Sequence, residues 1–542
     1  MAAKQRDISV SEFFAKNRHL LGFDNPRKAL LTTVKEAVDN SLDACEEASL
    51  VPEIWVHIES TGTNRYKVGV QDNGPGIMKK QIPLIFGKLL YGSKFHRLRM
   101  SRGQQGIGIS AAGMYGMLTT GKPVKIISKI SIRKPSHYYE LQIDTKKNRP
   151  EILNKRGEGE DIPPGEKGHK YLVKHGIEWV THYETSEGGK EKEVRSGTRV
   201  TIELEGRFHR GRGSVDDYLE QTAIANPHVT FHYEDPEGNK RTYQRSTTNL
   251  PVEPMEIKPH PYGVELGRLM TMLRDSSDTT MAQFLGSSFS RVSPGVARRI
   301  CEGAGLTVRS SPKRIGRQEA DALYQSIQET KIKAPATDCL SPIGEERILA
   351  SLEKQVAGAG FYQTITRSPS VYRGNPFQIE VGLAYGGELS SENLATVYRY
   401  ANRVPLLYQA GACALTKSVL ATNWKSYGLQ KARGALPTGP LVLMVHIASV
   451  WVPFTSESKE AVAGYDEIIK EVKLALQQVG RQLGAHIKRA AKARDAERKS
   501  QYIEKYIPHV GIALREILSL SDREEKKIVT TLTDTLRKSR KM

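Results

Sequence analysis

The stretch KEAVDNSLDA (residues 35–44) constrains the fold most, because it combines an apolar helical stripe with an unbroken acidic face. A proline after Asn25 predicts a helix that begins at Pro26 and continues to about Ala48. With about 100° per residue, its apolar side carries Leu30, Val34, Ala37, Val38, Ser41, Leu42 and Cys45. The opposite side carries Glu36, Asn40 and Asp43, with Asp39 at its edge.

Two interpretations of this acidic side are open. A solvated face is the common case, but such a face would usually include lysine, and none occurs from Glu36 to Ala48. A carboxylate and an amide oxygen at positions i and i+4 also form a good ligand set for Mg²⁺.

A second cluster, VQDNGPGI (residues 70–77), places an acid at the end of a predicted strand. Asp72 shares the strand face of Tyr66, Val68 and Val70, so its carboxylate should point inward. A buried carboxylate needs hydrogen-bond donors, and the exocyclic amine of a ligand is one natural donor. Taken alone, residues 73–76 are also an ordinary turn.

A third cluster, SRGQQGIGISAAG (residues 101–113), is rich in glycine. Gly103, Gly106 and Gly108 allow the backbone to approach phosphates, and the following helix offers its N-terminal N–H groups. A dinucleotide fingerprint is excluded here because the preceding RLRMSR is not a strand, and a P-loop is excluded because Pro123 replaces its Ser or Thr.

The pattern along the chain predicts a multidomain α/β protein. We expect an α/β sandwich with a hairpin over 54–72 and further strands in 123–132 and 197–204. Helical patterns dominate 264–330, and strands return in 376–387, 401–409 and 440–454. The predicted domains are 1–235, 236–330, 331–465 and 466–542.

A long helix is predicted over 457–507, a span without proline. Its apolar stripe is Tyr465, Ile468, Val472, Leu476, Val479, Leu483 and Ile487. Gly464, Gly480 and Gly484 are candidate bends in this helix.

The net charge of +20 and a pI near 9.5 favour a polyanionic partner, with nucleic acid as the leading candidate. No segment approaches the roughly 20 apolar residues of a membrane span, so no membrane association is expected. The four cysteines show no CxxC spacing, which argues against a disulfide framework or a zinc site and favours the cytoplasm.

The order of these clusters, followed by Ser-Gly-Thr at 196–198, resembles the Bergerat ATP-binding fold of gyrase, mismatch-repair ATPases, heat-shock chaperones and histidine kinases. This resemblance implies ATP and Mg²⁺ as cofactors. It implies Glu36 as the general base for the attacking water, Asn40 as the Mg²⁺ ligand and Asp72 as the acceptor of the adenine amine. The other nucleotide-contacting positions that it implies are Gly74, Gly76, Gly103, Gln104, Gln105, Gly106, Ile107, Gly108, Ile109, Ser110 and Thr198.

Longer segments resemble the B-subunit family of DNA topoisomerase VI over residues 10 to 508. They are FFAKNRHLLGFDNPRKALLTTVKEAVDNSLDA, FGKLLYGSKF, RGQQGIGISAA, SPIGEE, RYANRVPLLY and WKSYG. The resemblance implies a type II topoisomerase of A₂B₂ composition, in which the A subunit cleaves double-stranded DNA. This chain would be its ATP-operated gate, whose N-terminal domains dimerise on ATP, and would be nucleoid-associated in the cytoplasm. It also implies a small helical insert domain and a transducer domain with a long stalk helix.

Further roles follow residue by residue from this resemblance. Ser93 and Lys94 match nucleotide-contacting positions, and Lys459 matches a transducer lysine that reaches the γ-phosphate. The position of Lys459 alone would favour a solvated lysine at a helix start. The DNA-contacting positions would be Arg207, Arg210, Arg212, Trp424, Lys425 and Tyr427. Ser110 departs from the lysine that some relatives carry at the end of the glycine-rich segment.

Two alternatives from other classes remain. The chain could be a Bergerat-fold ATPase clamp of the chaperone or mismatch-repair type, without a topoisomerase partner. It could also be a catalytically silent DNA-binding scaffold, although Glu36, Asn40, Asp72 and the glycines are intact.

Overall fold

The computed structural model describes residues 14, 16–92, 97–103, 106–145, 147–184, 191–456 and 458–539. The described chain divides into two compact units. The first unit is Met1–Thr422 with Thr438–Val479, and the second is Asn423–Pro437 with Gly480–Met542. Within the described residues, no helix is both long enough and apolar enough to cross a membrane.

The first sheet of the larger unit contains, among the described residues, nine strands. Along the sheet they are β11 (Lys240–Tyr243), β10 (Thr230–Glu234), β1 (Glu53–Gly62), β2 (Arg65–Asp72), β9 (Gly197–Glu205), β3 (Val124–Lys129), β4 (Ser136–Asp144) and β5 (Arg149–Ile152), with β6 (Glu160–Ile162) paired to β4. The predicted hairpin is confirmed, because β1 and β2 pair antiparallel and Ile54 faces Asp72. β11 carries this sheet beyond residue 235, where the sequence places a domain boundary.

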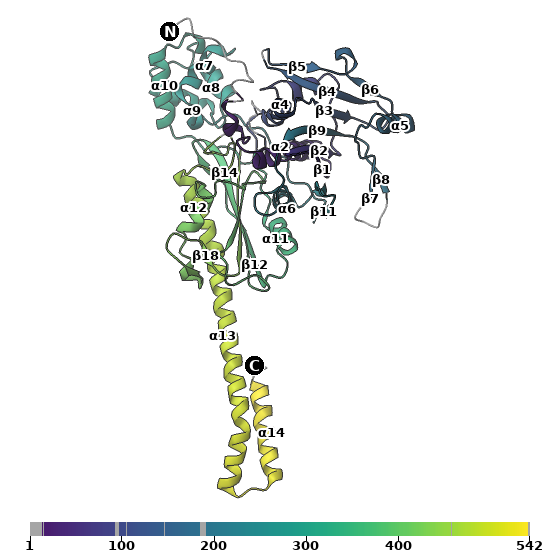
Figure 1. The fold of residues 1–542 in the computed structure, drawn as a ribbon. Helices are drawn as coiled ribbons and strands as arrows, with labels where there is room; N and C mark the ends of the chain where they lie inside the picture. The colour runs from purple at the N-terminus through teal and green to yellow at the C-terminus, as the bar shows by residue number, and fades with distance from the viewer. Residues whose placement is uncertain are drawn as a thin grey trace. The chain divides into compact units, whose positions relative to one another are not determined.

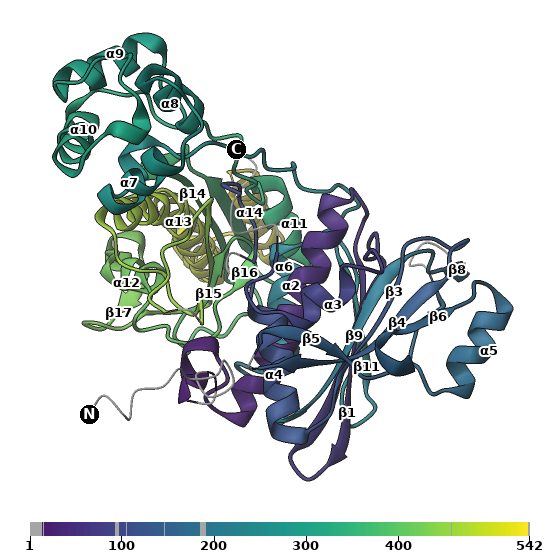
Figure 2. The same cartoon turned by 90° about the horizontal axis from the view of Figure 1, so that it is seen from above.

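One face of this sheet is covered by helices, as Figure 2 shows for α2, α3 and α4. They are α2 (Pro26–Glu47), α3 (Ile82–Gly87), α4 (Gly108–Thr120) and α6 (Val215–Ala225). The Asn25 side chain accepts a hydrogen bond from the Lys28 N–H and caps α2, while the apolar stripe predicted for this helix is buried in the core. The other face carries a smaller hydrophobic cluster that includes α5 (Glu166–Lys174). Separately, β7 (His182–Glu184) and β8 (Glu191–Glu193) pair with each other.

A helical group follows in the sequence, as predicted. It consists of the 3₁₀ turn Pro261–Gly263, α7 (Leu266–Asp275), α8 (Met281–Ser288), α9 (Pro294–Gly303) and α10 (Arg317–Glu329). These helices enclose an apolar core of their own, centred on Phe284, Ile300 and Leu323. Thr280 and Ser293 cap α8 and α9 with their side-chain oxygens.

The second sheet forms the predicted second α/β domain. Its order is β12 (Phe361–Thr366), β14 (Asn375–Tyr385), β19 (Leu441–Ser449), β15 (Thr396–Ala401) and β16 (Val404–Pro405), with β13 (Ser370–Tyr372) paired to β14. β15 runs parallel to β19, and the helices α11 (Glu345–Gln355) and α12 (Ala414–Ala421) flank the sheet. The strand predicted over 401–409 is wrong at Asn402 and Arg403, which adopt positive φ and form a turn between β15 and β16, and it is wrong again beyond Pro405, where β16 ends.

A buried carboxylate ties this second sheet to α11. Glu380 on β14 accepts hydrogen bonds from the backbone N–H groups of Ile343 and Gly344, each at 2.7 Å. It also contacts the Thr366 hydroxyl and the His446 Nδ1, each at 2.8 Å. Although burial alone raises the pKa of Glu380, these hydrogen bonds lower it overall.

The long helix α13 spans Asp466–Leu518 and is followed by α14 (Asp522–Ser539). Its predicted start is too early, because the described residues 458–465 are not helical and an isolated bridge joins Phe454 to Val462. The predicted stripe is buried at Ile468, Val472, Leu476, Val479 and Leu483. In the distal part α14 folds back along α13, as seen in Figure 1, and Arg515 pairs with Asp522 and Glu525.

In the smaller unit, Gly480 and Gly484 of α13 provide room for an aromatic ring. A Cβ on Gly480 would lie 2.4 Å from a ring carbon of Tyr427, in the 3₁₀ turn Trp424–Tyr427. The short strands β17 (Gln430–Lys431) and β18 (Pro437–Thr438) follow this turn. Gly480 and Gly484 therefore have a packing role against Tyr427.

We expect Glu380→Ala to lower the free energy of unfolding of the second α/β domain by about 3 kcal/mol or more, because it leaves several buried donors without an acceptor. Urea unfolding followed by circular dichroism measures this change. Glu353→Ala, at an exposed position on α11, is the matched control and should stay within about 0.5 kcal/mol of the parent. Equal stability of both variants would contradict a structural role for the buried carboxylate.

Candidate functional site

A cavity of about 680 Å³ lies beside the predicted acidic face of α2. Its lining combines α2, the turn after β2, the start of α4 and Thr198 of β9 with residues 405–408 and 458–460 from the second α/β domain. Cavities of a few hundred Å³ with a small number of polar groups are typical of small-molecule sites. The predicted residues that line it are Glu36, Asn40, Asp72, Gly76, Gly103, Gly106, Ile107, Gly108, Ile109, Thr198 and Lys459.

Asp72 lies at the floor of this cavity with its carboxylate buried, as its strand face predicts. It accepts hydrogen bonds from the Ser41 hydroxyl at 3.1 Å, the Gly74 N–H at 2.9 Å and the Thr198 N–H at 3.0 Å. Burial raises the pKa of Asp72 to about 6 in spite of these donors. A carboxylate in this position can accept a hydrogen bond from a ligand amine without meeting bulk water.

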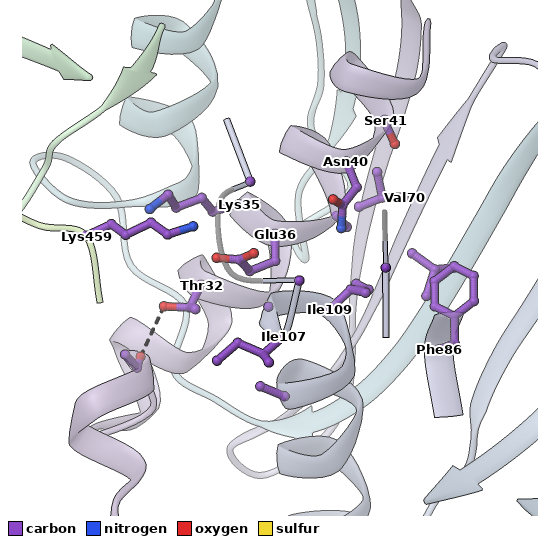
Figure 3. A pocket seen from close by; sticks show the side chains of 18 of the residues that line it. Thr32, Lys35, Glu36, Asn40, Ser41, Val70, Phe86, Ile107, Ile109 and Lys459 are labelled. Carbon is purple, nitrogen blue, oxygen red and sulfur yellow. Dashed lines mark hydrogen bonds between the residues drawn. The ribbon is translucent and has the colours of Figure 1, made fainter. Parts of the chain in front are cut away.

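Glu36 lies against the N-terminus of α4. A Cβ on Gly108 would lie 1.7 Å from the Glu36 Oε2, so only glycine fits at this position while the carboxylate stays where it is. Figure 3 shows Glu36 and Asn40 on one side of α2, with Lys35 and Lys459 nearby. The acid and the amide therefore line the same cavity as Gly103, Gly106 and Gly108, which are the glycines of the segment 101–113 (the lid). Two lysine side chains, Lys35 and Lys459, line it as well.

The remaining acids of this helix face are not solvated, which corrects the simpler interpretation for them. Asp39 is buried and accepts a hydrogen bond from the Tyr218 hydroxyl at 3.0 Å. Burial is the main cause that raises the pKa of Asp39 to about 6. Asp43 is also buried and pairs with Arg102 at 2.8 Å. Of this face, Asn40 is exposed and Glu36 is half-buried.

Lys459 is carried by a loop of the second α/β domain, with a backbone φ of 53°. This loop is attached to the first domain, because Glu460 pairs with Lys28 at 2.6 Å and Lys28 also pairs with Asp24 at 3.0 Å. Lys459 therefore lines the cavity from a domain that is distant in sequence from α2, and it is not a lysine at the start of a helix.

Several residues of the site were missed by the sequence reasoning. Lys35 lines the cavity, and its position next to Glu36 was the available signal. Residues 406–408 line the cavity as well, but the sequence pattern predicts a strand at these positions and does not indicate a site. Arg102 was missed because its partners Asp43, Glu46 and Asn226 are far away in the sequence. Burial alone would lower the pKa of Arg102, but the carboxylates of Glu46 and Asp43 raise it overall.

Other predicted nucleotide positions lie away from the cavity lining or outside the described residues. Gly74 supports Asp72 through its N–H, and the Ser110 hydroxyl donates to the Ile107 carbonyl at 3.1 Å. Neither of these two described residues lines the cavity. The predicted contacts of Ser93, Lys94, Gln104 and Gln105 lie outside the described residues.

The predicted DNA-contacting residues belong to two separate places. In the first domain, Arg207 and Arg212 are exposed, whereas Arg210 pairs with Asp235 and Glu237, each at 2.7 Å. In the smaller unit, Lys425 is exposed and Tyr427 half-buried. The Trp424 side chain is fully buried and lies edge-on to Tyr427, so its role is packing, not contact with an external ligand.

Two family comparisons cover most of the chain. Residues 25–207 match the family described as "Histidine kinase-, DNA gyrase B-, and HSP90-like ATPase", which identifies the N-terminal domain as ATP-binding. Residues 335–499 match "Topoisomerase VI B subunit, transducer".

Whole-chain relatives agree with these matches. The B subunit of type 2 DNA topoisomerase 6 from Methanococcoides burtonii is 47% identical over 519 residues, which cover 96% of this chain and 78% of that protein. The chain belongs to the topoisomerase VI B-subunit family. The protein of the same name from Archaeoglobus fulgidus is 45% identical, over 98% of this chain and 83% of that protein. The one from Pyrococcus horikoshii is 35% identical, over 96% and 93% respectively.

Membership of this family confirms the prediction of a type II DNA topoisomerase component with an ATPase domain and a transducer domain. The alternative of an ATPase clamp without a topoisomerase partner is not supported. Among solved structures, the DNA gyrase B-subunit from Myxococcus xanthus is similar with a TM-score of 0.40 and 12% identity, over 88% of this chain and 95% of that one.

We expect Gly108→Ala to reduce ATP hydrolysis by roughly 100-fold, because the added methyl group displaces the Glu36 carboxylate. Steady-state ATPase kinetics measure this loss. Gly295→Ala is the matched control, since a Cβ on Gly295 in α9 meets no atom within 4 Å. Full hydrolysis by Gly108→Ala would contradict the need for Glu36 in its observed position.

Proposed function

We propose that this cavity binds and hydrolyses ATP and that the chain acts as the ATP-operated gate of its topoisomerase. The observation that carries the proposal is the shared placement of Glu36, Asn40, Asp72 and Lys459 around one cavity built from both α/β domains. A nucleotide in this position would contact the ATPase domain and the transducer domain together. Its hydrolysis could therefore change how the two domains are held.

The residues present fit a nucleoside triphosphate. Asp72 and Thr198 form the end suited to an adenine amine, where the buried carboxylate offers an acceptor. Gly76 has φ of 71° and a Cβ there would lie 2.3 Å from the Lys129 carbonyl oxygen, so the turn can be this tight only with glycine. At the other end, the lid glycines and the N–H groups at the start of α4 would hold the phosphates. We place Ser93, Lys94, Gln104 and Gln105 with the phosphates on the basis of their motifs alone.

For hydrolysis, we propose that Glu36 orients the attacking water and accepts its proton. Lys459, and beside it Lys35, would stabilise negative charge that develops on the phosphate oxygens. Asn40, which is exposed at the cavity, would provide an oxygen ligand for Mg²⁺. A bound Mg²⁺ would neutralise phosphate charge and leave positioning as the main task of the protein.

The assembly that we propose is an A₂B₂ complex in which the A subunit cleaves DNA. ATP would dimerise the N-terminal domains of two copies of this chain and thereby trap a second duplex, and hydrolysis would reset the gate. The relatives are named as one of the subunits of a type 2 DNA topoisomerase, which supports an A-subunit partner and DNA as the substrate. We expect the complex in the cytoplasm at the nucleoid, and we retain the four predicted domains as its functional parts.

Contact with DNA would involve Lys425 beside α13 and the exposed arginines Arg207 and Arg212. The net charge of +20 supports this role, because cations on the protein release the counterions of the phosphate backbone. Arg210 would have to leave its carboxylate partners before it could bind DNA. Tyr427 would position the turn that presents Lys425, since its ring is seated against the glycines of α13.

We expect Glu36→Ala to retain ATP binding and to lose ATP hydrolysis, because the proton acceptor is removed while Asp72 remains. Asn40→Ala should instead weaken the binding of Mg·ATP itself. Calorimetric titration and steady-state ATPase assays separate the two effects. Unchanged turnover in Glu36→Ala, or unchanged Mg·ATP affinity in Asn40→Ala, would contradict the role assigned to that residue.

We expect Lys425→Ala to weaken the binding of bent duplex DNA and to reduce the slope of log affinity against log salt by about one, as expected for one lost phosphate contact. Binding isotherms at several salt concentrations measure this slope. Lys167→Ala is the control, because Lys167 is an exposed lysine on α5 with no assigned DNA contact. Equal slopes in the two variants would count against Lys425.

A further inference from the structure

The turn between β15 and β16 lies where the transducer domain meets the base of the glycine-rich lid. Asn402 and Arg403 form this two-residue turn, with φ of 49° and 67°. Asparagine often adopts a positive φ, but arginine rarely does, so the surroundings must hold the turn in place. The Asn402 N–H donates to the Ile447 carbonyl at 2.9 Å, and the Arg403 N–H donates to the His446 Nε2 at 3.0 Å.

The Asn402 side chain bridges the turn to the lid. Its Nδ2 donates to the Ser101 carbonyl at 2.8 Å and to the Ser449 carbonyl at 2.9 Å. Its Oδ1 accepts from the Ser449 N–H at 2.8 Å. Ser101 directly precedes Arg102 and Gly103, where the lid begins, so one amide group joins the lid to the end of β19.

A buried group of charges reinforces this bridge. Arg102 pairs with Glu46 at 2.6 Å, and Arg403 pairs with the same carboxylate at 3.2 Å. Asn226 of the C-cap of α6 accepts from Arg102 at 2.5 Å and donates to the Arg403 carbonyl at 3.2 Å. Two guanidinium groups from different domains therefore share the Glu46 carboxylate on α2, and the Asn226 amide links the Arg102 side chain to the Arg403 backbone.

The same turn is connected to the far side of the second sheet. Since the Arg403 N–H donates to the Nε2 of His446, that nitrogen carries no proton, and the Nδ1–H of His446 donates to Glu380 at 2.8 Å. Glu380 in turn accepts from the backbone N–H groups of Ile343 and Gly344 ahead of α11. Two sets of hydrogen bonds, joined by the peptide link between Asn402 and Arg403, thus connect Ser101 to the start of α11.

The turn also adjoins the catalytic part of the site. A second cavity of about 20 Å³, large enough for one water molecule, is lined by Glu36, Asn40 and Lys459. Arg102, Gly103 and Asn402 also line this cavity. A shift of the turn would therefore change the packing next to the proposed base and the proposed Mg²⁺ ligand.

We propose that Asn402 is a positioning residue that fixes the base of the nucleotide lid to the transducer sheet. Together with Arg102 it forms a second connection between the two domains, besides the pair of Glu460 with Lys28. The inference depends on the proposed function only in that a nucleotide binds beside Gly103. Because coupling between two sites is reciprocal, a nucleotide that stabilises the Ser101–Gly103 segment must also stabilise the turn.

The test uses the full chain with its A subunit and the variant Asn402→Gly. Glycine keeps the positive φ of the turn and removes the side-chain bridge. The affinity for a non-hydrolysable ATP analogue with Mg²⁺ should fall by about three- to tenfold, the usual effect of one hydrogen bond. The KM for ATP should rise by a similar factor while kcat changes less than twofold.

Amide hydrogen exchange provides a readout that a merely structural role would not change. In the parent protein, the ATP analogue should slow exchange at the amides of Asn402 and Arg403, both of which are hydrogen-bonded in the turn. In Asn402→Gly this protection by nucleotide should disappear. Asn402→Asp, which keeps the acceptor for the Ser449 N–H and loses the donor to Ser101, should show the same loss.

The matched control is Asn64→Gly, in the β1–β2 turn with φ of 55°. It changes the same residue type in the same backbone conformation, at the end of the hairpin opposite to Asp72, and should leave ATP affinity unchanged. Parent-like affinity and exchange in Asn402→Gly, or an equal loss in Asn64→Gly, would overturn the inference while the proposed function stands. A parent protein that does not bind the ATP analogue would overturn both.

Discussion

Asp72 holds its carboxylate in the interior between α2 and β9, where Ser41, Gly74 and Thr198 donate to it. The donors come from three parts of the first domain, so the floor of the cavity exists only when helix, turn and sheet are all in register. Removing a carboxylate from water is costly, and the raised pKa of Asp72 shows that these donors only partly offset that cost. A ligand that offers a further donor would complete the arrangement. This arrangement supports the proposal that an adenine amine binds at this end.

The contact between the two α/β domains contains a group of buried ion pairs. Arg102 and Arg403 meet Asp43 and Glu46 in a buried group in which the positive and negative charges balance. Such a group contributes little net stability compared with apolar packing, but the loss of one member leaves an uncompensated charge. Loss of either arginine would therefore leave a buried carboxylate with fewer partners at the place where α2 meets Arg102 and the turn.

Much of the fold could be predicted from the sequence because the governing periodicities are local. The 3.6-residue pattern placed Leu30, Val34 and Cys45 in the core, and strand alternation turned Asp72 inward. The burial of Asp39 and Asp43 could not be predicted, since their partners Tyr218 and Arg102 come from distant segments. The strand expected over 401–409 failed because apolar residues there line a cavity instead of a sheet. Lys459 was found through family resemblance, because nothing local separates it from a solvated lysine.

The contact between Gly108 and Glu36 has a consequence for how such a sequence can vary. The space that a side chain at position 108 would need is already filled by the carboxylate of residue 36. A larger residue at 108 would be compatible only with a shorter acid at 36, and that acid would no longer reach the same point in the cavity. Positions 36 and 108 are 72 residues apart in the chain, yet the size of the side chain at one position limits which side chain fits at the other.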